Sequence, residues 1–159
     1  MRQATARALS NIAFIKYWGN QDDALRLPHN STLSMNLAGL YTETRVQWDD
    51  ALQSDTLMLN GQPAKAPALK RVSNHLNVIR ERLHITARAQ VVSHNNFPMG
   101  AGIASSASAF AALTVASVAA AGITLTEREL TTLARLGSGS ASRSVPSGFV
   151  EWHIGDSHE

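Results

Sequence analysis

The chain has 159 residues, of which 44% are hydrophobic and 16% are charged, a length that suits one globular core and is short for two. The 14 Lys and Arg residues exceed the 12 Asp and Glu residues by only two, so no broad basic face of the kind that binds nucleic acid is expected, and a small or acidic ligand fits better. Because the chain has no cysteine, disulfides, thiolate metal sites and cysteine nucleophiles are excluded.

The sequence carries no recognisable targeting or membrane signal. Residues 1–14 lack the apolar core and the small-residue cleavage site of a secretory signal, and no stretch is apolar for long enough to span a bilayer. We therefore expect a cytoplasmic protein that has no membrane partner.

Two long strands open the predicted fold, over residues 4–15 and 31–48, with antiparallel pairing expected around Ala38 and Gly39. The alternation of side chains is clearest over residues 41–48, where one face would carry Thr42, Thr44, Val46 and Trp48. A short strand over residues 54–59 follows and ends at Asn60-Gly61, a dipeptide that favours a turn.

An amphipathic helix is predicted over residues 66–83. Its apolar side chains recur at spacings of three and four and would share one face: Leu69, Val72, Leu76, Ile79 and Leu83. The polar side chains expected to point away from that face are Lys70, Arg71, Asn74, Arg80 and Glu81. This helix should pack on the sheet, and another strand is expected over residues 86–94.

Residues 95–108 contain two glycines, a proline and three serines before an alanine-rich run that favours a helix over residues 106–122. Backbone N–H groups at a helix N-terminus hold phosphate well, glycine allows a close approach, and serine adds donors. No Gly-Lys-Ser/Thr follows, so this is not a nucleotide P-loop. From these residues alone, a phosphate loop and an ordinary glycine-rich connection are equally supported. A second helix should begin at the capping box of Thr126 and Glu129 and run to about residue 136.

Two further segments contain candidates for anion binding. Residues 137–144 hold four serines, two glycines and Arg143, whose planar fork matches a carboxylate or a phosphate, and they suggest a flexible, donor-rich loop. Lys16 lies in an otherwise apolar run, where it either extends to water or faces an anion. His29 is a possible lining residue nearby, whereas the other histidines show no metal-ligand spacing.

Residues 11–23, 95–113 and 134–152, in this order, resemble the three signature segments of the mevalonate diphosphate decarboxylase and phosphomevalonate decarboxylase family, in the GHMP kinase superfamily. The glycine-serine loop indicates only the superfamily, whereas "KYWG" and "GSGSASRS" are specific to the decarboxylases. The resemblance implies an α+β domain over residues 1–159 with the ribosomal protein S5 domain 2-like fold. It also implies that the ferredoxin-like C-terminal domain, which carries the aspartate acting on the 3-hydroxyl, is largely absent, so this chain alone should be inactive.

The implied reaction of the family is ATP-dependent. A phosphoryl group is transferred to the tertiary 3-hydroxyl of a 5-phosphorylated mevalonate, and loss of phosphate and CO2 then gives an isopentenyl phosphate product of the mevalonate pathway of isoprenoid biosynthesis. By resemblance, Lys16, Ser140 and Arg143 are catalytic. The implied substrate-binding residues are Tyr17, Trp18, Asn20, Ser140 and Arg143. The implied ATP-binding residues are Pro98, Met99, Gly100, Ala101, Gly102, Ile103, Ala104, Ser105 and Ser106. Mg2+ should bridge ATP oxygens, with Ser106 as the candidate protein ligand.

Three positions depart from the family pattern. Diphosphate-specific members commonly have a second lysine where this chain has Asn20, which slightly favours phosphomevalonate over diphosphomevalonate as substrate. Ser142 replaces a cysteine, and Ser147-Gly148 replaces a glycine pair.

Three alternatives stay open: a diphosphomevalonate decarboxylase that yields isopentenyl diphosphate, a GHMP small-molecule kinase that does not decarboxylate, and an RNA-binding module. The kinase alternative leaves Arg143 in its serine setting unexplained, and the low net charge argues against RNA. The expected partners are the C-terminal half of the same enzyme and a second copy in a homodimer.

Overall fold

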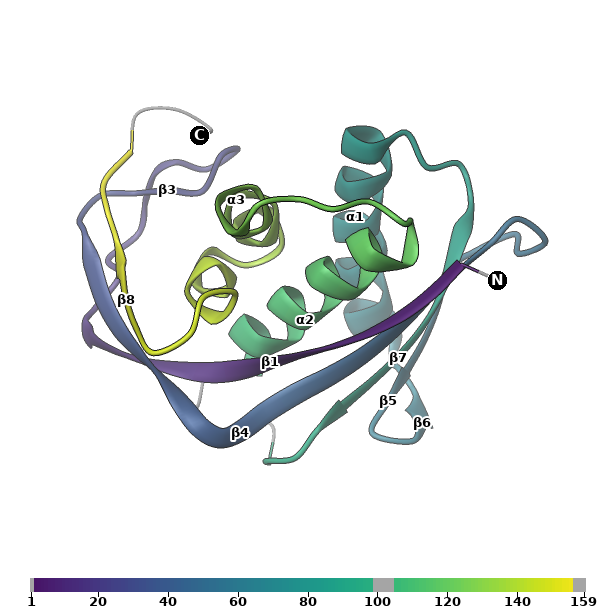
Figure 1. Ribbon diagram of the computed structural model, residues 1–159, viewed down its shortest axis with the longest axis horizontal. Helices are drawn as coiled ribbons and strands as arrows, with labels where there is room; N and C mark the ends of the chain where they lie inside the picture. The colour runs from purple at the N-terminus through teal and green to yellow at the C-terminus, as the bar shows by residue number, and fades with distance from the viewer. Residues whose placement is uncertain (1, 99–104, 156–159) are drawn as a thin grey trace.

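The computed structural model describes residues 2–98 and 105–155 and shows a curved mixed sheet with three α-helices on its concave side (Figure 1). Along the chain the elements are β1 (Arg2–Ile15), β2 (Asn20–Asp22), β3 (Leu27–Pro28), β4 (Thr32–Asp49), β5 (Thr56–Leu59), β6 (Gln62–Pro63), α1 (Ala66–Leu83), β7 (Arg88–Asn95), α2 (Ser105–Ala120), α3 (Glu127–Gly137), the 3-10 helix η1 (Gly139–Ser144) and β8 (Phe149–Trp152). This arrangement confirms the predicted α+β class.

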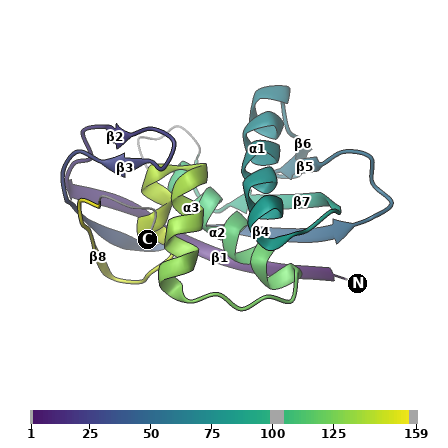
Figure 2. The ribbon, with the colours of Figure 1, turned by 90° about the horizontal axis from the view of Figure 1, so that it is seen from above.

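The main sheet has the strand order β1-β4-β7-β5-β6, and β8 pairs with β4. β4 is antiparallel to β1, β7 and β8, whereas β5 and β7 are parallel. Seen from above, β8 and the β2–β3 hairpin lie at one end of the molecule, next to α3, and α1 lies with β5 and β6 at the other end (Figure 2).

β1 and β4 pair antiparallel, as predicted, and the pairing is interrupted at Ala38 and Gly39. The register between β1 and β4 shifts between the pairs Leu9–Tyr41 and Asn11–Asn36, so β4 carries extra residues there. Gly39, with φ of 88°, lies among them. A bulge of this kind bends a strand, and Figure 1 shows the bend in β4.

The face of β4 predicted to be buried is buried. Thr42, Thr44, Val46 and Trp48 all point into the core, and the Trp48 indole donates a hydrogen bond of 2.9 Å to the Ser117 carbonyl of α2. Asn60 and Gly61 have positive φ values and form the predicted turn between β5 and β6.

α1 has the predicted bounds, and Leu76 and Ile79 of its apolar stripe are fully buried. The prediction that Arg80 points away from the buried face of α1 is wrong. Arg80 is buried, because acceptors lie within reach of its guanidinium. The Asp55 carboxylate forms an ion pair with it, and the Ala87 carbonyl accepts a 2.8 Å hydrogen bond from its Nε.

α2 is the central helix, lying against β1 and β4 with α1 and α3 in contact with it (Figure 1). It is buried on nearly all sides, and its many alanines let the sheet and the other helices approach closely. α3 begins at the predicted capping box of Thr126 and Glu129, in which both reciprocal hydrogen bonds form. Within the described residues, none of the helices is long and apolar enough to cross a membrane.

Residues 137–144 are not the flexible loop that their composition suggests. Gly137 ends α3, and residues 139–144 form η1, in which Ser142 and Arg143 are buried. The serine hydroxyls need little room and find partners nearby; Ser142, for example, donates a 2.9 Å hydrogen bond to the Gly139 carbonyl. A segment rich in small polar residues is therefore packed against β1, β4 and α2.

Candidate active site

Arg143 is a buried cation in η1, with only 5% of its surface exposed. Its Nη1 donates a 2.7 Å hydrogen bond to Thr32 Oγ1, and its Cζ lies 5.9 Å from the centroid of the Trp152 ring. Burial lowers the pKa of Arg143, and the nearby Tyr17 opposes that shift. Because a guanidinium stays charged in proteins, Arg143 offers a fixed positive charge that suits a carboxylate or a phosphate.

Tyr17 lies between β1 and β2 and stacks on Trp152, with ring centroids 5.5 Å apart and an interplanar angle of 16°. Its hydroxyl hydrogen bonds to Asn20 Oδ1, and Asn20 Nδ2 donates a 2.8 Å hydrogen bond to Asp23 Oδ1. Burial raises the pKa of Tyr17, and the charge of Arg26 opposes that rise. Tyr17 is therefore a neutral phenol at physiological pH. Because Trp152 contacts both side chains, Tyr17 and Arg143 lie in the same region of the structure.

Lys16 and Trp18 flank Tyr17 but stay at the surface. Trp18 is 79% exposed and Lys16 is also exposed, so the structure does not bring these two predicted site residues to Arg143. Asn30 holds their backbone: its Nδ2 donates to the Lys16 carbonyl at 2.8 Å, and the Trp18 N–H donates to its Oδ1 at 3.3 Å. His29 is exposed beside this segment, where its N–H donates to the Gly19 carbonyl at 3.0 Å.

Three serine hydroxyls connect η1 to the first turn of α2. Ser138 Oγ lies 3.3 Å from Ser140 Oγ and donates to Ser106 Oγ across 3.5 Å. Asn11 of β1 fixes the same segment from the sheet side, because its Nδ2 reaches the Ser140 carbonyl at 3.2 Å and Ser144 Oγ at 2.7 Å. The structure thus places Ser140, predicted to act on substrate, close to Ser106, predicted to bind ATP.

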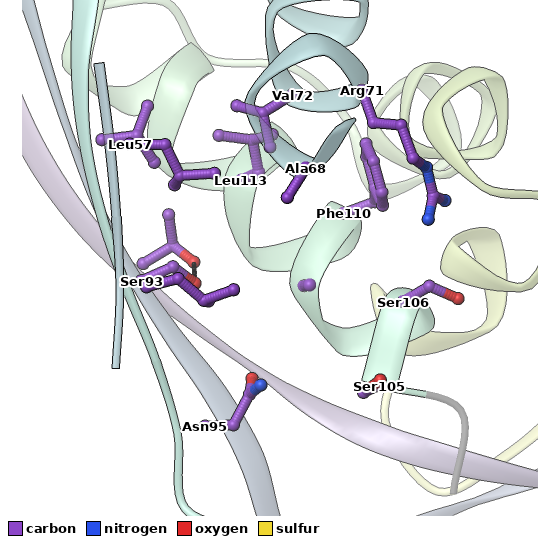
Figure 3. Close-up of a pocket in the computed structure, with 14 residues that line it drawn as sticks. Leu57, Ala68, Arg71, Val72, Ser93, Asn95, Ser105, Ser106, Phe110 and Leu113 are labelled. Atoms are coloured by element: carbon purple, nitrogen blue, oxygen red, sulfur yellow. Dashed lines mark hydrogen bonds between the residues drawn. The ribbon is translucent and has the colours of Figure 1, made fainter. Parts of the chain in front are cut away.

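A cavity of about 250 Å3 opens beside this serine row. It lies between α1, α2 and the strands β4, β5 and β7, and Figure 3 shows Ser105 and Ser106 at one end of it and Leu57, Val72 and Leu113 toward the other. Most of the side chains that line it are apolar, and polar groups are few: Thr44, Arg71, Ser93, Asn95, Ser105 and Ser106. Such a cavity suits a flat, largely apolar ring with a polar attachment.

Ser105 and Ser106 are the first residues of α2. The N–H groups of a helix's first turn have no partners within the helix, and the helix dipole favours negative charge there. Pro98, also predicted to bind ATP, is exposed just before the undescribed segment. The predicted residues Met99, Gly100, Ala101, Gly102, Ile103 and Ala104 lie outside the described residues.

A second cavity, of about 320 Å3, lies between α3, η1 and β8. Arg128, Arg135 and Arg143 line it, against a single carboxylate, that of Glu151. This excess of positive charge favours anionic groups on the α3 side of Arg143. Among residues 2–98 and 105–155, no three His, Asp or Glu side chains are grouped so that they could hold a metal ion.

Sequence reasoning missed four residues that shape the site: Asn11, Thr32, Ser138 and Trp152. Asn11, Ser138 and Trp152 all lie inside the signature segments, so their positions were visible. Their roles could not be predicted from sequence. Thr32 and Trp152, for example, contact Arg143 only because β4 pairs with β8.

The sheet, the serine-headed helix and the buried arginine define a class of protein: an α+β domain built around adjoining sites that suit two anionic ligands. The family model described as the diphosphomevalonate decarboxylase-like N-terminal domain matches residues 8–159. The chain belongs to the diphosphomevalonate decarboxylase-like family, as the sequence resemblance predicted.

Named relatives show the same family. Diphosphomevalonate decarboxylase of Schizosaccharomyces pombe is 39% identical over 98% of this chain and 43% of its own length, and that of Rattus norvegicus is 38% identical over 96% and 41%. The chain thus spans less than half the length of these curated relatives.

Solved structures agree. The mevalonate diphosphate decarboxylase of Staphylococcus aureus superposes with a TM-score of 0.95 at 45% identity, covering 98% of this chain and 47% of that one. The mevalonate diphosphate decarboxylase of Enterococcus faecalis superposes with a TM-score of 0.94 at 44% identity, covering 98% of this chain and 49% of that one. A structure of MDDEF in complex with MVAPP, AMPPCP and magnesium gives 0.93 at 44% identity, covering 98% and 48%.

Proposed function

We propose that the protein to which this chain belongs is an ATP-dependent decarboxylase of a 5-phosphorylated mevalonate, and that residues 1–159 are its N-terminal ATP- and substrate-binding domain. The row formed by Ser106, Ser138 and Ser140 carries the proposal, because it joins the helix N-terminus suited to ATP phosphates to the segment that holds Arg143. Phosphoryl transfer requires the two ligands to lie in contact, and this row is where they would meet.

The proposed ATP site is the cavity of about 250 Å3 together with the first turn of α2. The base would lie among the apolar side chains near Phe110 and Leu113, and the phosphates would reach the N–H groups and hydroxyls of Ser105 and Ser106. Mg2+, when bound with ATP, would neutralise phosphate charge. With no metal cluster among the described residues, Ser106 is the proposed protein ligand and ATP oxygens supply the rest.

The proposed substrate site is next to Ser140 and Arg143. Arg143 would hold the carboxylate that leaves as CO2, and its fixed position would orient that group relative to the 3-hydroxyl. A tertiary alcohol is a poor leaving group and its phosphate ester a good one, so the residues of this chain have to keep the anions in place while positive character develops at C3. Tyr17, a neutral phenol, would meet the phosphorylated end, with Lys16 reaching it from the surface.

The finer prediction that phosphomevalonate is favoured over diphosphomevalonate rests on Asn20 alone. Asn20 bonds to Tyr17 and Asp23 and supplies no positive charge for a terminal phosphate. The relatives are named for the diphosphate, which supports the alternative product, isopentenyl diphosphate. A direct comparison of kcat/KM for the two substrates decides between them.

The complete protein should release CO2 from a phosphorylated mevalonate only when ATP is present. Consumption of ATP and phosphorylation of the substrate without CO2 release would instead identify a small-molecule kinase, the second candidate, which needs the serine-headed helix but gives Arg143 no role. The proposed homodimer is tested by the mass of the native full-length protein in solution.

A further inference from the structure

Trp152 contacts two side chains that the proposed function assigns to the substrate, although the three residues come from different parts of the chain. Its ring stacks on Tyr17 with centroids 5.5 Å apart, and the Arg143 Cζ lies 5.9 Å from its centroid. Only 9% of Trp152 is exposed, so the ring is held in place by its surroundings. An uncharged, buried indole of this kind acts through its neighbours.

The backbone explains why Trp152 lies beside Arg143. In the β4–β8 ladder Trp152 is paired with Thr32, and the two side chains of a cross-strand pair leave the same face of the sheet. Thr32 Oγ1 accepts the 2.7 Å hydrogen bond from Arg143 Nη1. One cross-strand pair therefore contacts the guanidinium twice, with a hydroxyl and with an aromatic ring.

Tyr17 depends on the same ring more strongly. It belongs to residues 16–19, which are outside any helix or strand, and Trp152 is the aromatic partner of its ring. A Cβ placed on Gly139 would lie 3.5 Å from Trp152 Cη2 and 3.9 Å from Tyr17 Cζ, so the start of η1 touches the edges of both rings. Without the indole, Tyr17 would lose the surface that orders its ring.

We propose that Trp152 is a positioning residue, which sets the separation between Tyr17 and Arg143 and thereby the fit of the phosphorylated mevalonate. This inference rests on the proposed function, because it assumes that Tyr17 and Arg143 meet the two charged ends of one substrate. It distinguishes the substrate from ATP: Trp152 does not line the cavity proposed for the nucleotide. Loss of the ring should weaken substrate binding and leave ATP binding nearly unchanged.

The test compares Trp152→Leu and Trp152→Phe in the full-length protein. Trp152→Leu should raise KM for the phosphorylated mevalonate about tenfold, with KM for ATP changed less than about twofold, because a stacked ring and a cation–π contact are both lost. Trp152→Phe, which keeps a ring that can stack, should recover most of the loss.

Trp48 supplies a matched control, because it is also a buried tryptophan beneath an arginine. Arg80 Cζ lies 5.3 Å from its ring, and its indole bonds to Ser117 in the core, away from the serine row. Trp48→Phe should lower Tm and leave both KM values unchanged. Equal rises in KM for ATP and for substrate in Trp152→Leu, or the same kinetic change in Trp48→Phe, would show that Trp152 is merely structural.

Two further measurements keep the inference testable. If Trp152→Leu does not fold, Trp152→Phe is combined with Tyr17→Leu. The rise in KM of the double variant should be smaller than the product of the two single-variant rises, and a rise equal to that product would overturn the inference. Substrate dissociation constants measured by calorimetry without ATP separate the two proposals. A wild-type protein that neither binds the substrate nor releases CO2 overturns the proposed function, whereas an active wild type with unchanged binding in Trp152→Leu overturns only the role of Trp152.

Discussion

Ser138 Oγ donates a hydrogen bond to Ser106 Oγ across 3.5 Å and so connects the end of α3 to the first turn of α2. The two residues are 32 positions apart in the chain, and each belongs to a different signature segment. If the first turn of α2 holds ATP and η1 holds the substrate, Ser138 is the group that keeps the two sites in register.

Ser138→Ala should lower kcat/KM about 30-fold, because it removes two hydroxyl contacts worth roughly 1 kcal/mol each and leaves the backbone unchanged. Steady-state kinetics with ATP and the phosphorylated mevalonate varied in turn measure the effect. Ser147→Ala is the matched control, since Ser147 is exposed and lies outside the row. Equal kinetics in the two variants would remove Ser138 from the site.

Arg143→Ala should cost about 3 to 5 kcal/mol of transition-state stabilisation, the range expected when one partner of a buried charged contact is removed. Arg143→Lys keeps the charge but loses the planar fork, so it should restore only part of the activity. kcat/KM for each variant, with Tm as the control for folding, checks this. Near-normal kcat/KM in Arg143→Ala would place the carboxylate elsewhere.

Asn20→Lys should shift preference toward diphosphomevalonate, because it adds a positive charge next to Tyr17, where the phosphorylated end of the substrate is proposed to lie. The ratio of kcat/KM for the diphosphate to that for the monophosphate should rise about tenfold. Asn20→Gln retains an uncharged amide and should leave the ratio unchanged. If both variants give the wild-type ratio, Asn20 does not determine the preference between the monophosphate and the diphosphate.

Gly137→Ala should destabilise the protein by about 1–3 kcal/mol, the usual cost of overpacking a core. An added Cβ would lie 2.8 Å from His75 Nδ1 and would also strike the Phe110 ring. The sign of the change in unfolding free energy is informative, because replacing glycine by alanine in an unhindered helix stabilises a protein by about 0.5 to 1 kcal/mol. Urea unfolding measures the change, with Arg128→Ala on the exposed side of α3 as control. An increase in stability would mean that α3 is free to move away from His75.

His75 should make stability fall as the pH is lowered. Burial, together with a smaller contribution from the charge of Arg26, lowers its pKa from 6.5 to about 4. Since the unfolded chain takes up a proton near pH 6.5 and the folded chain does not until about pH 4, stability present above pH 6.5 is lost progressively between these values, by about 3 kcal/mol in all.

Urea unfolding of the wild type and of His75→Gln between pH 7.5 and pH 4.5 checks this assignment. The variant lacks the titrating ring, so the difference in stability between the two proteins should shrink as the pH falls. Parallel curves over the whole interval would show that another group is responsible.

The elements that sequence predicted well are those with local causes. α1 is defined by its apolar spacing, and α3 by the capping box of Thr126 and Glu129, which involves residues three apart. The bulge in β4 and the packing of η1 were missed because both depend on distant partners: β1 shifts register against β4, and Asn11 and Thr32 hold η1 from strands more than 100 residues away.

The candidate site divides in the same way. The motifs identified Tyr17, Asn20, Ser106, Ser140 and Arg143, and the structure brings these residues into one region. Trp18 lies in the same motif, but its side chain is exposed, and Asn30 contacts its backbone N–H. Motif membership therefore locates a segment, while the direction of each side chain depends on the sheet and on η1.

The most direct test of the central claim is the release of CO2 from a carboxyl-labelled phosphorylated mevalonate by the full-length protein, measured with and without ATP. The proposed function predicts release that requires ATP, in equal amounts with the ADP and phosphate formed, and release that is abolished or nearly so in Arg143→Ala. Formation of ADP and a phosphorylated product with the label retained would contradict it.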